Sequence, residues 1–152
     1  MKAANTIRTG SMIIIATMAW FGLILQLYLI VEAIPRNHLS LASEVFRYFS
    51  YFTILTNLLV AISLTSIFIS WHSRWGKFFG RPEVQSAIAL YIGVVGITYS
   101  VALRHVWNPT GWQLVADRIL HDAVPFLYVL YWAFFVPKQT LRWKHPLWWL
   151  LY

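Results

Sequence analysis

Two polar residues in the second half of the chain and one hydroxyl in the first half are suited to acid–base chemistry. Asp117 and His121 are four residues apart, so on a helix they share a face and the carboxylate can orient the imidazole. Thr53 carries a hydroxyl within an apolar stretch. A hydroxyl acts as a nucleophile when a base lies within about 2.6–3.2 Å and is itself oriented by a third group. The residue types therefore predict a site in which Thr53 attacks, His121 is the general base and Asp117 orients it.

Further polar residues are expected beside this site, because antiparallel helices bring them to the same depth. Arg104 and His105 end one apolar segment, and Asn57 lies one helical turn after the hydroxyl. These three residues are predicted to bind the substrate. Arg104, together with Arg47 or Arg118, is expected to hold a fatty carboxylate, because guanidinium groups bind carboxylates in a bidentate manner.

Two stripes at helical spacing also have a purely structural interpretation. Hydroxyl and amide side chains often form hydrogen bonds between membrane helices, and small residues let such helices pack closely. The first stripe comprises Ser50, Thr53 and Asn57. The second, for which close helix packing is the preferred interpretation, comprises Ala89, Gly93, Gly96 and Ser100.

His121 and its neighbour Asp122 are the ionisable pair within the apolar segments, and such groups are costly at membrane depth. Pro125 lies four residues after His121 and withholds the N–H that would bond the His121 carbonyl, which predicts a kink beside the histidine. The alternative begins the helix earlier, at the capping-box pattern Thr110–Gln113. His121 would then lie near the interface, where polar side chains are tolerated.

The elements that position these residues are predicted from composition. The chain has 152 residues, of which 59% are apolar and 11% are charged. Crossing about 30 Å of hydrocarbon takes about 20 apolar residues. Four segments approach or exceed that length: 12–31, 48–71, 84–103 and 119–136. We therefore predict an all-α fold, a polytopic integral membrane helix bundle that forms a single domain over residues 1–152.

A further apolar stretch begins at about residue 146, and we interpret it as the start of a truncated fifth span. Eight of the 12 basic residues lie at the N-terminus and in the second and fourth connections, against four in the first and third. Basic residues concentrate on the cytoplasmic side, so we expect a cytoplasmic N-terminus in a cell inner or plasma membrane.

Several classes of function are excluded or unsupported. The net charge of +7 lies in the connections and forms no basic stripe, so we expect membrane lipids and no nucleic acid as partners. The chain has no cysteine, which excludes disulfides and cysteine-based metal sites, and we predict no metal and no cofactor. No motif of the common soluble hydrolases, nucleotide-binding proteins or zinc proteases is present.

Three segments resemble a family of bacterial six-span membrane proteins that is similar to the animal FAR-17a/androgen-induced proteins. These segments are YFSYFTILTNLL at 48–59, LRHVWNPTG at 103–111 and HDAVPF at 121–126. The resemblance implies further membrane spans. It also implies hydrolysis of fatty-acid esters by a threonine and a histidine, which correspond here to Thr53 and to His121 before Pro125.

The preferred hypothesis is therefore a membrane-embedded hydrolase of lipid esters that acts at the outer edge of the bilayer. The first alternative is a non-enzymatic membrane protein that binds or transports a lipid or solute in a polar-lined cavity. The second alternative is a b-type haem protein with His105 and His121 as axial ligands.

Overall fold

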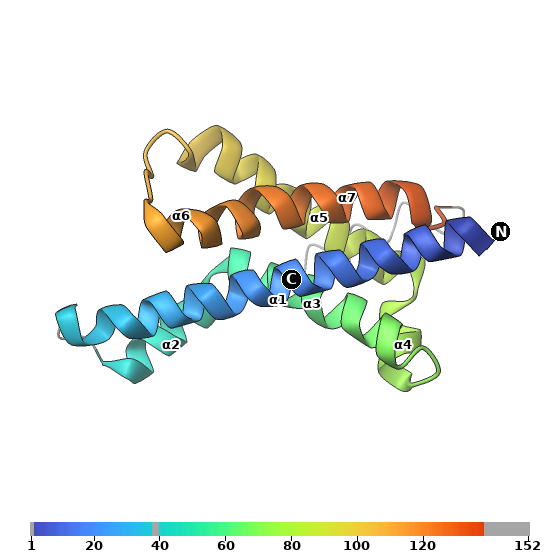
Figure 1. Cartoon of the computed structure of the whole chain (residues 1–152), viewed down its shortest axis with the longest axis horizontal. Coiled ribbons are helices and arrows are strands. Elements are labelled where there is room, and N and C mark those ends of the chain that lie inside the picture. The colour runs from blue at the N-terminus through green and yellow to red at the C-terminus, as the bar shows by residue number, and fades with distance from the viewer. Residues whose placement is uncertain (1, 38–39, 139–152) are drawn as a thin grey trace.

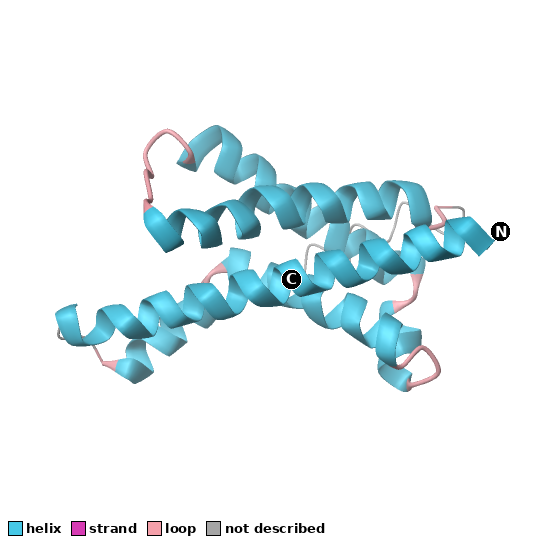
Figure 2. Cartoon of the chain, in the orientation of Figure 1, coloured by secondary structure: helices cyan, strands magenta, loops and turns pink. Residues whose placement is uncertain are grey.

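The computed structural model describes residues 2–37 and 40–138, and within these ranges every regular element is a helix (Figures 1 and 2). The elements follow one another as α1 (Lys2–Asn37), α2 (Leu41–Ser50), α3 (Phe52–Ile69), α4 (Arg74–Phe79), α5 (Pro82–Thr98), η1 (Tyr99–Leu103), α6 (Gly111–Arg118), η2 (Ile119–Ala123) and α7 (Val124–Phe135). The elements η1 and η2 are π-helical turns. The predicted all-α architecture is confirmed for the described residues, and the predicted fifth span lies outside them.

Three helices are long and apolar enough to cross a membrane: Asn5–Ile34, Phe52–Ile69 and Pro82–Leu103. Large apolar side chains also face outward, and Ile24, Ile97 and Phe134 expose 63%, 67% and 78% of their surface. Apolar exposure on this scale is typical of a surface that faces lipid. The three helices support an integral membrane protein, whereas a fourth complete span is not confirmed.

The core forms where α1 packs along α3 and along the run from α6 to α7 (Figure 1). Its buried α1 residues recur every three or four positions, which places them on one helical face. They are Met12, Ile15, Ala16, Ala19 and Leu23. Gly22 lies on the same helix so close to η2 that a Cβ there would lie 2.8 Å from Cγ2 of Ile119. Gly22 thus lets the side chains of Ile119 and Leu120 pack directly against α1.

The second predicted segment is divided in the structure. Tyr51 is extended, with φ −77° and ψ 125°, so α2 ends at Ser50 and α3 begins at Phe52. The hydroxyl of Ser50 bonds the carbonyl of Phe46 within α2. The predicted continuous stripe of Ser50, Thr53 and Asn57 is therefore wrong at Ser50, because the helix breaks between the first two residues.

The last predicted segment lies within a longer helical run, in which α6, η2 and α7 follow one another without a break from Gly111 to Phe135. The helix thus begins eight residues before the preferred boundary, as the alternative interpretation expected. Thr110 is the N-cap, but its side chain makes no capping hydrogen bond, so the capping box itself does not form. The run is uninterrupted before Pro125, and residues Ile119–Ala123 form a π turn that ends two residues before it.

Candidate functional site

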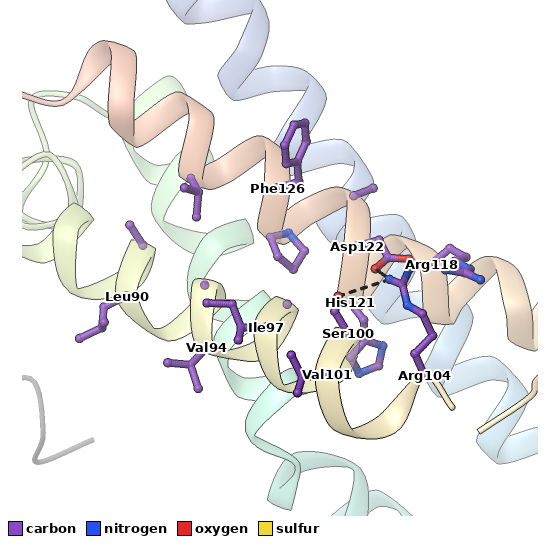
Figure 3. A pocket seen from close by; sticks show the side chains of 16 residues that line it. Leu90, Val94, Ile97, Ser100, Val101, Arg104, Arg118, His121, Asp122 and Phe126 are labelled. Atoms are coloured by element: carbon purple, nitrogen blue, oxygen red, sulfur yellow. Dashed lines mark hydrogen bonds and ion pairs between the residues drawn. The ribbon is translucent and has the colours of Figure 1, made fainter. Parts of the chain in front are cut away.

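A groove of about 960 Å³ runs between the helix pair α5–η1 and the helix pair η2–α7 (Figure 3). Apolar side chains line most of its length, including Leu90, Val94, Ile97, Val101 and Phe126. Its polar end is lined by Ser100, Arg104, Arg118, His121 and Asp122. Ala89 and Arg104 are 15 residues apart along α5 and η1, which gives the groove a length of about 22 Å. An apolar channel of this length with charges at one end matches the shape of an amphiphile.

Asp122 organises the charges at the polar end. One carboxylate oxygen bonds Arg104, and the other lies 2.8 Å from Nη1 of Arg118 (Figure 3). Two guanidinium groups thus share one carboxylate, so one of the two positive charges has no carboxylate of its own in this cluster.

Behind this cluster, Tyr99 and Asp117 hold the imidazole of His121. The Nδ1 atom of His121 lies 3.1 Å from the carbonyl oxygen of Asp117 and 3.3 Å from its carboxylate. The phenol of Tyr99 donates to the other carboxylate oxygen of Asp117, and its ring stacks on the imidazole at 4.4 Å and 21°. Asp117 is 3% exposed and His121 is 19% exposed. The contacts favour the tautomer with the proton on Nδ1, which leaves Nε2 as the basic atom.

The π turn explains the role of Asn57. The N–H of Val124 bonds the carbonyl of Ile119, and Pro125 has no N–H, so the helix offers no donor to the carbonyl of Leu120. The side-chain amide of Asn57 donates to this carbonyl at 3.1 Å from α3. A buried carbonyl without a partner is costly, above all in a membrane. Asn57 therefore stabilises the π turn that carries His121.

Two glycines on α5 determine how wide the groove is. A Cβ at Gly96 would lie 3.0 Å from Cβ of Pro125 and 3.5 Å from the His121 carbonyl, so this glycine permits close packing as predicted. A Cβ at Gly93 would meet only a methyl group of Val129, at 3.9 Å. Gly93 thus leaves space open, and the small-residue stripe both packs helices and forms the groove floor.

The structure brings together only part of the predicted site. Asp117 and His121 are adjacent, and Arg104 lies at the same end of the groove beside Arg118. Arg47 instead pairs with Glu44 in α2, so it does not join them.

The other predicted site residues lie outside the groove. Thr53 is half-buried on α3, and its carbonyl accepts a hydrogen bond from Asn57 at 2.9 Å. It does not line the groove, and no hydrogen bond joins its hydroxyl to His121 in the described part of the chain. Asn57 is fully buried and acts on the backbone rather than on the groove. His105 is exposed in the turn after η1 and does not line the groove, so it is not brought to the site as a haem ligand beside His121.

Sequence reasoning missed three participants. The sequence assigns no role to Tyr99, only close packing to Ser100 and no site role to Asp122, whereas the structure places Ser100 and Asp122 in the groove and Tyr99 against Asp117. The spacing of Arg118 and Asp122, four residues apart, was a usable signal for their pair. Tyr99 gives no such signal, because it and Asp117 are 18 residues apart in sequence and lie on different helices.

The described residues contain no group of three or more His, Asp or Glu side chains arranged to hold a metal ion. No family model matches the chain, and neither a curated protein nor a solved structure matches it.

Proposed function

We propose that the chain binds an amphiphilic lipid in the groove between α5 and α7. The acyl chain would lie along the apolar wall, and an anionic or ester head group would lie against Arg104, Arg118 and His121. The observation that carries this proposal is the polarity of the groove, which is apolar over most of its length and charged at one end. The spare positive charge of the arginine cluster gives an anionic head group a Coulombic partner.

The membrane arrangement that fits this function is a bundle in which the run from α6 to α7 is a fourth span. The groove would then open sideways to lipid, and its polar end would lie near one membrane surface. The basic residues favour the opposite surface as the cytoplasmic one, because the N-terminus and the second and fourth connections carry eight of the 12 basic residues. The proposed location is therefore a cell inner or plasma membrane, with the N-terminus on the cytoplasmic side.

The groove can be tested by filling it. We expect a photoactivatable palmitic acid analogue to label α5 and α7 in the full chain embedded in lipid nanodiscs. Gly93→Leu places a side chain in the open floor of the groove, and should reduce this labelling at least fivefold. Gly10→Leu is the matched control, because a Cβ at Gly10 meets no atom within 4 Å and lies away from the groove. Equal labelling of the two variants would exclude the groove as the binding site.

Hydrolysis of a lipid ester is the second candidate, and it is favoured by the pairing of Asp117 with His121. A carboxylate that fixes an imidazole is the arrangement that prepares a histidine to act as a general base. The base would activate either water or the hydroxyl of Ser100, which lines the same end of the groove. Thr53 remains the nucleophile implied by the resemblance to the FAR-17a/androgen-induced family, which itself stays a proposal.

A fluorophosphonate probe applied to native membranes distinguishes these nucleophiles. Hydrolysis through Ser100 predicts labelling that is lost in His121→Gln and Ser100→Ala and is retained in Thr53→Ala. Hydrolysis through Thr53 predicts retention in Ser100→Ala and loss in the other two variants. A folded chain that binds the palmitic acid analogue but is labelled in no form would leave lipid binding without covalent catalysis.

A further inference from the structure

A second cleft lies at the opposite end of the bundle, between the first turns of α1 and the end of α3. It has a volume of about 720 Å³. Its polar part comprises Asn5, Thr6, Arg8 and Thr9, and its apolar part comprises Met12, Ile13, Ile67 and Phe68. Trp71, two residues after the end of α3, also lines it. The cleft is distinct from the groove, because the two share no lining residue.

Arg8 is the only charged residue among the described residues that line this cleft. Its guanidinium lies over the indole of Trp71, with the carbon at 6.0 Å from the ring centre. The Nε atom is buried and has no hydrogen-bond partner in the described structure. A guanidinium has five N–H donors, and leaving a buried donor unpaired is costly. Among the described residues no carboxylate holds this side chain in place, so it can turn toward an oxygen that enters the cleft.

The position of the cleft identifies the kind of oxygen it would meet. The spanning part of α1 begins at Asn5, so the polar residues lie where a membrane helix emerges and the apolar residues lie one or two turns deeper. Tryptophan at the end of a span is typical of the head-group layer. From the surface inward, the cleft thus changes from polar to apolar in the same order as a phospholipid.

We infer that this cleft binds the phosphodiester of an anionic phospholipid from the surrounding leaflet. Arg8 pairs with the phosphate, the hydroxyls of Thr6 and Thr9 lie at head-group level, and the first part of an acyl chain covers Met12 and Ile13. The inference does not depend on the ligand or the chemistry of the groove between α5 and α7.

The alternative to a specific site is the general attraction of a basic membrane surface for anionic lipid. Arg74, the exposed first residue of α4, supplies the control, because its removal changes the net charge by the same amount and it does not line the cleft. The two variants Arg8→Gln and Arg74→Gln therefore separate a cleft from bulk charge.

The test is native mass spectrometry of the full chain released from nanodiscs that contain equal amounts of phosphatidylglycerol and phosphatidylcholine. We expect the wild-type chain to retain one phosphatidylglycerol, and Arg8→Gln to reduce its retention about tenfold. Arg74→Gln should reduce it less than twofold, and Gly10→Leu, which fills the cleft, should resemble Arg8→Gln. Millimolar inorganic phosphate should not displace the lipid, because phosphate alone makes no contact with the apolar part.

Equal losses in Arg8→Gln and Arg74→Gln would overturn the inference in favour of bulk charge. Displacement by inorganic phosphate would overturn the lipid as the ligand. Circular dichroism of each variant checks that the helices remain. Failure here would leave labelling of the groove unchanged, and failure of the groove would leave phosphatidylglycerol retention unchanged.

Discussion

The groove between α5 and α7 and the cleft beside Arg8 both place arginine next to an apolar wall, but the two sites differ in what the arginine contacts. In the groove, Arg104 and Arg118 share the carboxylate of Asp122. In the cleft, Arg8 meets an indole and no acid among the described residues. The first pair of charges is fixed before any ligand arrives, whereas the second charge is left to a ligand.

The difference extends to what lies behind each site. The polar end of the groove is supported by buried contacts from Tyr99, Asp117 and Asn57. Such prior fixing of polar groups favours selectivity and, where chemistry occurs, rate. The cleft is formed by side chains of two helix ends, and its arginine lies over the exposed indole of Trp71. We therefore expect selective recognition at the groove and charge-dependent recognition at the cleft.

The largest effect is expected when the buried support of the groove is removed. Tyr99→Phe deletes the hydroxyl that donates to Asp117, and the carboxylate keeps only its contact with His121. A buried hydrogen bond to a charged group contributes about 2 kcal/mol, and we expect a loss of this size in the free energy of unfolding in detergent micelles. Tyr28→Phe on the exposed face of α1 should change it by less than about 0.5 kcal/mol. Similar losses in both variants would mean that the Tyr99 contact contributes no specific support.

The next effect, about 1–2 kcal/mol, concerns the carbonyl of Leu120. Asn57→Leu removes its donor, whereas Pro125→Ala restores a backbone N–H in the same turn. We therefore expect the double variant to lose less unfolding free energy than the sum of the two single variants. The double-mutant cycle measures this coupling directly. Additive losses would contradict the role of Asn57 as a replacement for the missing backbone donor.

Much of the fold could be predicted because it follows from local patterns. Long apolar segments predict spans at 12–31, 48–71 and 84–103, and the structure has membrane-length helices at 5–34, 52–69 and 82–103. The pairing of Asp117 with His121 was also predictable, because a spacing of four residues determines which side chains share a helical face.

The rest of the site depends on contacts between helices. A single sequence does not show which residues of two helices lie side by side. Thr53 is predicted to join the site because it should lie at the same depth in the membrane as His121. Depth alone does not show whether its side chain faces the groove, and in the structure Thr53 does not line the groove. No proline or glycine lies near the helix break at Tyr51, so the sequence does not indicate it. Tyr99 begins one π turn and Asp117 lies just before the other, and a single sequence does not indicate where such turns form.

The third effect would make the groove resemble the cleft. Asp122→Asn removes the carboxylate that Arg104 and Arg118 share, so an anionic head group no longer competes with that carboxylate for the two guanidinium groups. We expect the palmitic acid analogue to bind about tenfold more tightly, with a steeper dependence on salt, because the freed charges are partly exposed. Glu83→Gln, in the first turn of α5, removes the same charge away from the groove and should leave the affinity unchanged. Weaker binding in Asp122→Asn would show that the carboxylate positions the arginines rather than competing for them.

The smallest effect is the converse change, which would make the cleft resemble the groove. Asn5 lines the cleft one helical turn before Arg8, so Asn5→Asp places a carboxylate within reach of the unpaired guanidinium. An exposed pair of this kind stabilises a helix by about 0.2–0.5 kcal/mol. Because the new acid occupies Arg8 and repels phosphate, phosphatidylglycerol retention should fall about threefold while groove labelling stays constant.

Asn108→Asp in the exposed loop before α6 adds the same charge away from the cleft and should not affect retention. Retention that is unchanged in Asn5→Asp, or equally reduced in both variants, would show that an unpaired Arg8 is not what distinguishes the cleft. A selective fall in Asn5→Asp, combined with the gain expected in Asp122→Asn, would mean that one carboxylate beside an arginine controls anion binding at each end of the bundle.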